Sequence, residues 1–197
     1  VRDTDQINLT DEESRIMPRS GGGGFDQCYN AQAAVDVASM LIVGAHLSAS
    51  PSDVRQLAPM LDQLAKVPDE VGLPATVLAD AGFFSQANVE RCLARRVRPL
   101  IARRRDQHYT PWLDRLAEPP PLDAAAGPVE RMAHDRQTAQ GRALYRLRKQ
   151  TVEPVFGIIK SVMRFRQFLL RGLAKTSGEW RLVAMAWNIR RMAVLAG

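Results

Sequence analysis

The chain has 197 residues, of which 46% are hydrophobic, so it is long and apolar enough to fold as one domain and is not globally disordered. Lysine and arginine number 27 against 21 aspartate and glutamate, and the net charge of +6 favours an anionic partner, nucleic acid before membrane. Two cysteines exclude a disulfide framework and fit a reducing cytosol, and no apolar run is long enough to cross a bilayer.

The first half of the chain shows a polar opening followed by strand and helix patterns. Residues 1–24 are predicted to be a connector because they are polar and close on four consecutive glycines. Alternating polar and apolar residues predict a strand over 28–37, and the short apolar run at 40–47 predicts a second. Spacing and turn signals then predict, in order, a helix over 54–67, a strand over 75–80, a helix over 86–96 and a strand over 97–102 that suits a sheet edge because it contains Pro99.

The second half is predicted to be irregular at first and helical afterwards. Residues 104–137, with EPPPLDAAAGP at their centre, read as an insertion. Residues 138–170 are mostly helical, and Pro154 either kinks this helix or lies in the first turn of a new one capped by Thr151. A last helix covers 177–196. A hairpin followed by alternating strands and helices predicts an α/β fold with a mixed sheet and helices on its faces.

Two acids are candidates for chemistry. Asp80 ends a predicted strand, at the sheet edge where ligands bind in open α/β folds, although a lone aspartate there is more often a turn former or helix cap. Glu153 precedes Pro154 and, taken alone, is equally well explained as a helix-start residue. Brought together on a basic protein, two carboxylates can hold Mg²⁺ or Mn²⁺ against a phosphodiester while lysines and arginines hold the DNA backbone.

Three segments resemble bacterial insertion-sequence transposases of the DDE type. LADAGFFS is similar to the second acidic segment of that family, YRLRKQTVEPVFGIIKSVMRFRQFLLRGLAKTSGEW to the third, and GFDQCYNAQAAVD to the strand pair before them. The resemblance implies a ribonuclease H-like mixed sheet with helices on both faces, a divalent metal, and strand cleavage and transfer at transposon ends. Residues 25–197 would then be the C-terminal part of the catalytic domain of a bacterial cytoplasmic protein. That protein would bind double-stranded DNA, at transposon ends and at the target, and would be associated with the nucleoid when bound. A homodimer is a possible assembly.

The resemblance also assigns roles by position. Asp80 matches the second catalytic acid and Glu153 the third, both as metal ligands. Gly82 and Phe83 match the Gly-aromatic pair that follows the second acid, and Lys160 matches the family lysine that contacts DNA near the cleavage site.

The basic residues depart from the family spacing Tyr-x2-Arg-x3-Glu-x6-Lys. Counted back from Glu153, the Arg position falls on Lys149, while Tyr145 and Arg148 are each one residue out. A lysine keeps the charge but not the bidentate grip on phosphate. DNA contacts are therefore expected from Lys149 and Arg148, and from Arg103 and Arg104 in the RRR run.

The first catalytic acid is not found where the resemblance expects it, on an opening strand upstream of DEESRIM. Asp36 lies on the wrong strand, and Asp3, Asp5 and Asp11 precede no strand pattern. The chain is therefore expected to begin inside the connector, to lack the first strand and to be inactive alone. The alternatives are a non-catalytic DNA-binding remnant of a degraded element and a ribonuclease H-like nuclease with other substrates.

Overall fold

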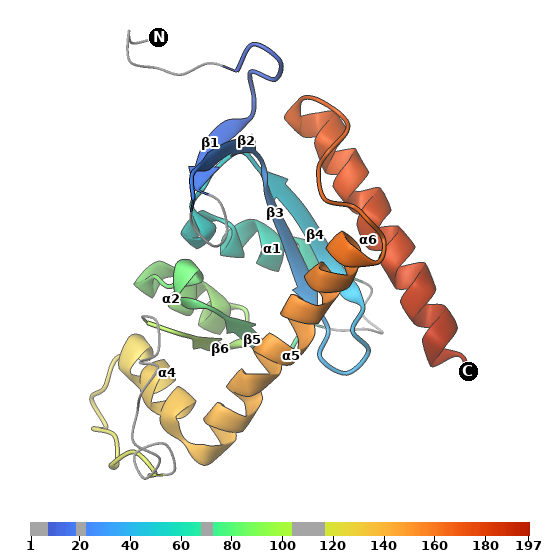
Figure 1. The fold of residues 1–197 in the computed structure, drawn as a ribbon. Helices are drawn as coiled ribbons and strands as arrows, with labels where there is room; N and C mark the ends of the chain where they lie inside the picture. Colours follow the sequence, from blue (N-terminus) through green and yellow to red (C-terminus); the bar gives the residue numbers. More distant parts are fainter. Residues whose placement is uncertain (1–7, 19–22, 68–72, 104–116) are drawn as a thin grey trace, which may run out of the picture. The chain divides into compact units, whose positions relative to one another are not determined.

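The computed structural model describes residues 8–18, 23–67, 73–103 and 117–197, which form a mixed α/β structure (Figure 1). The chain divides into two compact units. Unit 1 comprises Val1–Ser52 and Pro154–Gly197, and unit 2 comprises Asp53–Glu153. Arg104, Asp3 and Asp5, which the sequence analysis considered, lie outside the described residues.

The strands of unit 1 form two antiparallel pairs. Strand β1 (Arg15–Pro18) pairs with β2 (Phe25–Cys28), and β3 (Asn30–Val35) pairs with β4 (Ile42–Ser48). In the tight turn between β3 and β4, one Asp36 oxygen accepts hydrogen bonds from the Ser39 amide and hydroxyl, at 2.7 and 2.6 Å. These bonds lower the pKa of Asp36 and commit its carboxylate to the turn.

Helix α6 (Leu173–Leu195) covers this hairpin and closes the core of unit 1. The indole N–H of Trp180 donates to the Gln32 carbonyl at 2.9 Å, and that of Trp187 donates to the Met40 carbonyl at 2.8 Å. Both rings are buried, as expected for core tryptophans that keep a hydrogen-bond partner. The buried core comprises Tyr29, Ile42, Leu47, Val155, Ile159, Trp180, Ala184 and Trp187.

Residues 8–18 are part of the folded unit, although the sequence suggested only a connector over 1–24. Asp11 is buried, and both of its oxygens accept from the Tyr29 hydroxyl at 2.8 Å. One of them also accepts from the Gly172 amide at 3.2 Å, and Glu13 accepts from the Leu173 amide at 2.8 Å. These acids satisfy orphan amides at the start of α6. The sequence gives no local sign of these contacts because the partners lie far along the chain.

Unit 2 is built on a parallel strand pair. Strand β5 (Thr76–Ala79) pairs in parallel with β6 (Arg98–Ile101), and helix α2 (Gln86–Ala94) connects them. A 3₁₀ turn, η1 (Asp53–Arg55), precedes helix α1 (Leu57–Leu64), and a second, η2 (Ala81–Phe83), follows β5. The buried core comprises Leu57, Leu61, Ala79, Val89, Cys92, Val97, Ile101 and Met132. The helices and strands expected from 28 to 102 are thereby confirmed, although their ends differ by a few residues: most are shorter, β4 ends one residue later at Ser48, and Cys28 belongs to β2.

Residues 128–137 were expected to be irregular, and this is wrong for them. They form helix α4 (Pro128–Gln137). Proline suits the first helical position because its missing N–H would have no partner there. The Glu130 carboxylate accepts from the Gly127 amide at 2.8 Å, and Met132 is buried in the core of unit 2. The helix was not predicted because the proline-rich residues before Gly127 led the whole of 104–137 to be interpreted as one irregular insertion.

Helix α5 (Ala139–Ser161) is continuous and contains Pro154, so the alternative of a new helix capped by Thr151 is wrong. Thr151 is buried, and its hydroxyl donates to the Leu147 carbonyl at 2.9 Å, one turn back inside the same helix. Glu153 therefore lies well inside a helix, and its reading as a helix-start residue is also wrong.

Candidate active site at the end of strand β5

Asp80 lies directly after β5 and uses its two oxygens differently. Oδ1 accepts from the Gly82 amide at 3.0 Å and so caps the turn η2. Oδ2 lies 3.8 Å from a terminal guanidinium nitrogen of Arg148. The side chain is 50% exposed. The local reading of Asp80 as a cap is therefore correct for one oxygen, and the other remains accessible to a ligand.

Helix α5 contacts the end of β5 through two side chains. The Tyr145 hydroxyl donates to the carbonyl of Ala79, the last residue of β5, at 3.2 Å. The guanidinium groups of Arg136 and Arg148 lie over the Tyr145 ring, 5.1 and 5.5 Å from its centroid. Arg148 Nε is buried and has no hydrogen-bond partner among the residues that the structure describes. Tyr145 and Arg148 thus hold the basic helix beside Asp80, although each lies one residue away from the position that the family spacing expects.

Glu153 lies on the same helix, and its side chain is exposed. Among the residues that the structure describes, no hydrogen bond or ion pair is found for the Glu153 side chain. It follows Arg148 by five residues, which is about 7.5 Å along the helix axis and ~140° around it. Val152, four residues after Arg148, lies on the face that contacts β5, so Glu153 is turned from that face by about 100°.

Asp53 is an acid near this site that the sequence analysis missed. A Cβ placed on Gly82 would lie 3.0 Å from an Asp53 oxygen and 3.1 Å from Asp80 Oδ1, so both carboxylates border this glycine. Asn88 holds the two turns together, because its buried amide donates to the carbonyls of Val54 in η1 and Phe83 at the end of η2, each at 2.8 Å. In the sequence, Asp53 closes SPSD, a typical helix-start signal directly before the helix predicted over 54–67, so nothing local marks it as a site residue.

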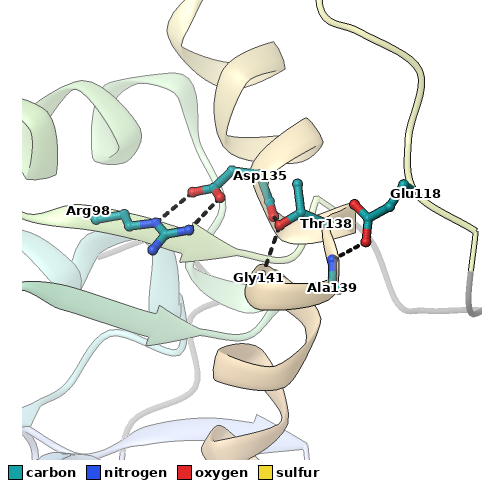
Figure 2. Close-up of polar contacts among 6 residues, drawn as sticks. All are labelled: Arg98, Glu118, Asp135, Thr138, Ala139 and Gly141. Carbon is teal, nitrogen blue, oxygen red and sulfur yellow. Dashed lines mark hydrogen bonds and ion pairs between the residues drawn. The ribbon is translucent and has the colours of Figure 1, made fainter.

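A polar corner between α4 and α5 fixes the start of α5 (Figure 2). Arg98 on β6 binds both oxygens of Asp135, with its Nε donating at 2.7 Å. The Thr138 hydroxyl donates to the Asp135 carbonyl at 2.8 Å and accepts from the Gly141 amide at 3.0 Å. Glu118 accepts from the Ala139 amide at 2.8 Å. The corner ties α5 to β6, the strand paired with β5.

Three other predicted DNA-contacting residues, Arg103, Lys149 and Lys160, are exposed, and Arg104 lies outside the described residues. Arg103 follows β6 directly, Lys149 lies one residue after Arg148 on α5, and Lys160 lies in the last turn of α5. Lys160 belongs to unit 1, whereas Asp80, Glu153 and Arg148 belong to unit 2. Phe83, matched to the family aromatic, packs against the core of unit 2.

The donor chemistry of the site suits a hard divalent cation. Asp80, Glu153 and Asp53 offer carboxylate oxygens, which Mg²⁺ and Mn²⁺ prefer. Among the described residues, no three or more histidine, cysteine, aspartate or glutamate side chains lie close enough together to hold a metal. Nor does a search of those residues find a helix long and apolar enough to cross a membrane.

Comparison with known proteins gives one family match. A family model described as "Transposase DDE domain" matches residues 5–189, nearly the whole chain. No curated protein and no solved structure matches.

Proposed function

Because the chain belongs to the Transposase DDE domain family, we propose that it serves the metal-dependent cleavage and transfer of DNA strands at the ends of a bacterial insertion sequence. The observation that carries this proposal is the contact of α5 with the end of β5. Tyr145 and Arg148 bring a basic helix, with Glu153 further along it, against the strand that ends in Asp80. A basic helix beside a strand-end carboxylate supports a site for an anionic, phosphodiester-containing substrate.

The proposed roles follow from chemistry and position. Asp80 and Glu153 would hold Mg²⁺ or Mn²⁺, which stabilises the attacking and leaving oxygens when bound. Lys149, Lys160, Arg103 and Arg104 would contact phosphates, since lysines and arginines bind the backbone without reading sequence. Arg148 would balance the charge of Asp80, because a terminal nitrogen of its guanidinium lies 3.8 Å from Asp80 Oδ2.

The fold proposed is ribonuclease H-like, with 25–197 as the C-terminal part of the catalytic domain. An antiparallel hairpin, β3–β4, followed by a parallel pair, β5–β6, supports this order of elements. Within the described residues, β3 and β5 are each paired along only one edge, and an unpaired edge can accept a further strand. A strand that carries the first acid would satisfy such an edge.

DNA binding is tested by fluorescence anisotropy with a duplex at rising salt. The affinity should fall steeply, because phosphate contacts release counterions, and Lys149→Ala and Arg103→Ala should each reduce the salt slope by about one. Lys66→Ala, two residues after the end of α1, is the equal-charge control and should leave the slope unchanged. Binding that is absent at low salt, or indifferent to salt, contradicts a DNA partner.

Metal binding is tested by electron paramagnetic resonance of Mn²⁺. Asp80→Asn and Glu153→Gln should each weaken Mn²⁺ binding, whereas Asp62→Asn, an exposed acid paired with Arg95, should not. DNA binding with no Mn²⁺ binding would favour the alternative of a non-catalytic remnant.

We further propose that these 197 residues do not cleave DNA alone, because two carboxylates hold a metal pair poorly. The test is a nicking assay with Mn²⁺ on transposon-end DNA and on unrelated duplex. Cleavage of transposon ends that is lost in both Asp80→Asn and Asp53→Asn would show that Asp53 supplies the missing acid. Equal cleavage of any duplex would favour the nuclease alternative.

A further inference from the structure

Exposed basic side chains gather on the segment of unit 1 that connects α5 to α6 (Figure 1). Residues 154–178 contain no acid, and five of their side chains are basic and exposed: Lys160, Arg164, Arg166, Arg171 and Lys175. The Asp11 and Glu13 carboxylates lie at the far end of the segment, on the amides that start α6, so the positive charge is concentrated over 160–166. Such a concentration of charge attracts an anionic partner.

The backbone of this segment has an arginine where glycine is the usual residue. The Phe165 amide donates to the Ile159 carbonyl, six residues back, at 3.1 Å, and this bond closes the end of α5. Inside the closure, Arg164 has a φ of +58°, in the left-handed region that favours glycine. A cation is favoured near the C-terminus of a helix, but Lys160 in the last turn of α5 gains this without a left-handed backbone. The strained backbone at Arg164 therefore indicates a use for its exposed side chain.

Glu179, in the second turn of α6, fixes the middle of the segment. Its two oxygens accept from the Leu169 amide at 2.9 and 3.1 Å, and one of them also accepts from the Leu170 amide at 3.0 Å. These charge-assisted bonds hold the two amides in place of water and so keep the backbone on one path. Arg166 Nε donates to the Lys160 carbonyl at 3.3 Å, which draws the start of the segment together. The basic side chains thus extend from an ordered backbone.

Loss of Glu179 would have two effects of opposite sign on the binding of an anion. Removing a negative charge beside a basic surface strengthens its attraction for the anion. Removing the acceptor of two amides releases the segment, which must then be ordered again when the anion binds, and this weakens binding. The sign of the measured change therefore separates an acid that orders the segment from one that merely lies beside it.

We propose that Glu179 is a positioning residue that presets residues 160–171 as a DNA backbone-binding surface of unit 1, where Arg164 and Arg166 contact phosphates. The choice of DNA as the partner rests on the proposed function. An ordered segment raises the affinity because the entropy of fixing it is lost on folding rather than on binding. Phosphate contacts carry no base information, so this surface should bind a duplex of any sequence.

The experiment is fluorescence anisotropy of a labelled duplex with the 197-residue chain at rising salt. Glu179→Ala should weaken binding about fivefold, although it removes a negative charge, because the segment must be ordered on binding. Glu179→Gln keeps one acceptor oxygen and should fall between wild type and Glu179→Ala. Glu12→Ala, which removes an exposed acid of the same unit, should bind as tightly as wild type or more tightly.

Arg164→Gly and Arg96→Gly are a matched pair of variants. Both arginines are exposed and have a φ of +58°, so each glycine should raise the midpoint of urea unfolding. Arg164→Gly should nevertheless weaken DNA binding and reduce the salt slope by about one. Arg96 precedes β6, at the opposite end of that strand from Arg103, and Arg96→Gly should leave the slope unchanged. Circular dichroism establishes that each variant is folded.

Two results overturn the proposal while DNA binding by the wild-type chain stands. One is a Glu179→Ala chain that binds as tightly as wild type or more tightly, because charge alone then describes this acid. The other is equal affinity of Arg164→Gly and Arg96→Gly, because binding would then not depend on this surface; this pair also decides the matter if Glu179→Ala does not fold. A wild-type chain that binds no duplex at low salt overturns the proposed function and this inference with it, so the two failures are distinguishable.

Discussion

Replacing Gly141 by alanine tests the corner between α4 and α5. Alanine in an open helix is favoured over glycine by about 1 kcal/mol. At Gly141, however, an added Cβ would lie 2.8 Å from the carbonyl carbon of Asp135 and 3.0 Å from Cα of Arg136, and closer still to the Asp135 carbonyl oxygen. All three are backbone atoms, which cannot rotate away as a side chain could, so the end of α4 must shift.

The cost of that shift outweighs the gain in helix propensity. Overpacking costs about 1–3 kcal/mol. Loosening the Arg98–Asp135 ion pair adds at most about 1 kcal/mol, because both side chains are about one-third exposed and water screens their attraction. Gly141→Ala should therefore destabilise the protein by about 1–3 kcal/mol net.

Urea unfolding followed by circular dichroism measures the effect, with Gly157→Ala and Gly178→Ala as controls. Both control glycines are helical with nothing within 4 Å of an added Cβ, and each substitution should stabilise by about 0.5–1 kcal/mol. If Gly141→Ala stabilises as much as the controls do, the close approach of α4 to α5 is wrong.

Three further predictions concern buried polar groups. Burial raises the pKa of Asp11, but hydrogen bonds, led by that from Tyr29, hold it below its ordinary value. The stabilisation from these hydrogen bonds is present above the ordinary carboxyl pKa and is lost as pH falls through the pKa of the folded state. Tyr29→Phe should therefore lower the free energy of unfolding by about 1.5–3 kcal/mol at neutral pH and by less in acid, as measured by urea titration at each pH. Asn88→Ala should lower the free energy of unfolding by about 2–3 kcal/mol, because it leaves two carbonyls unpaired; a loss under about 0.5 kcal/mol, typical of a surface change, would contradict the role of Asn88 in holding η1 and η2 together. Burial raises the pKa of the Cys92 thiol to about 11, so mass spectrometry should find Cys28, half-buried, alkylated well before Cys92; equal rates would contradict this burial.

Local patterns predicted the elements whose signals lie within their own residues. Alternation predicted β3, and the apolar run that ends in an acid predicted β5. Turn signals predicted a helix from residue 86, and α2 begins there, where the Ser85 hydroxyl accepts from the Asn88 amide. Each signal acts over a few residues, so neighbouring residues are sufficient to reveal it.

The errors arise where distant contacts decide the local structure. Pro154 disfavours a helix interior by about 3 kcal/mol, yet α5 continues through it, because Val155 and Ile159 on the same helix are fully buried in a core formed with β3–β4 and α6. Asp11 stabilises a helix start 161 residues further along the chain. No window on the sequence contains both partners of such a contact.

The site shows the same division between local and distant information. Asp80 was weighed as either a turn former or a functional acid, and the structure shows that one oxygen serves the turn while the other faces Arg148. The offset of Tyr145 and Arg148 from the family spacing was visible in the sequence, but its meaning was not. These two residues define the face of α5 that meets β5, so Glu153 lies about 100° around the helix from the residue in register with them. A glutamate side chain has three rotatable bonds, so the exposed Glu153 carboxylate can extend back toward β5. If the helix were instead rotated so that Glu153 itself faced β5, as the family spacing counted from Glu153 requires, Tyr145 and Arg148 would be turned away from the strand. If Glu153 holds a metal with Asp80, as proposed, its side chain must extend toward the strand while Tyr145 and Arg148 keep α5 in contact with β5.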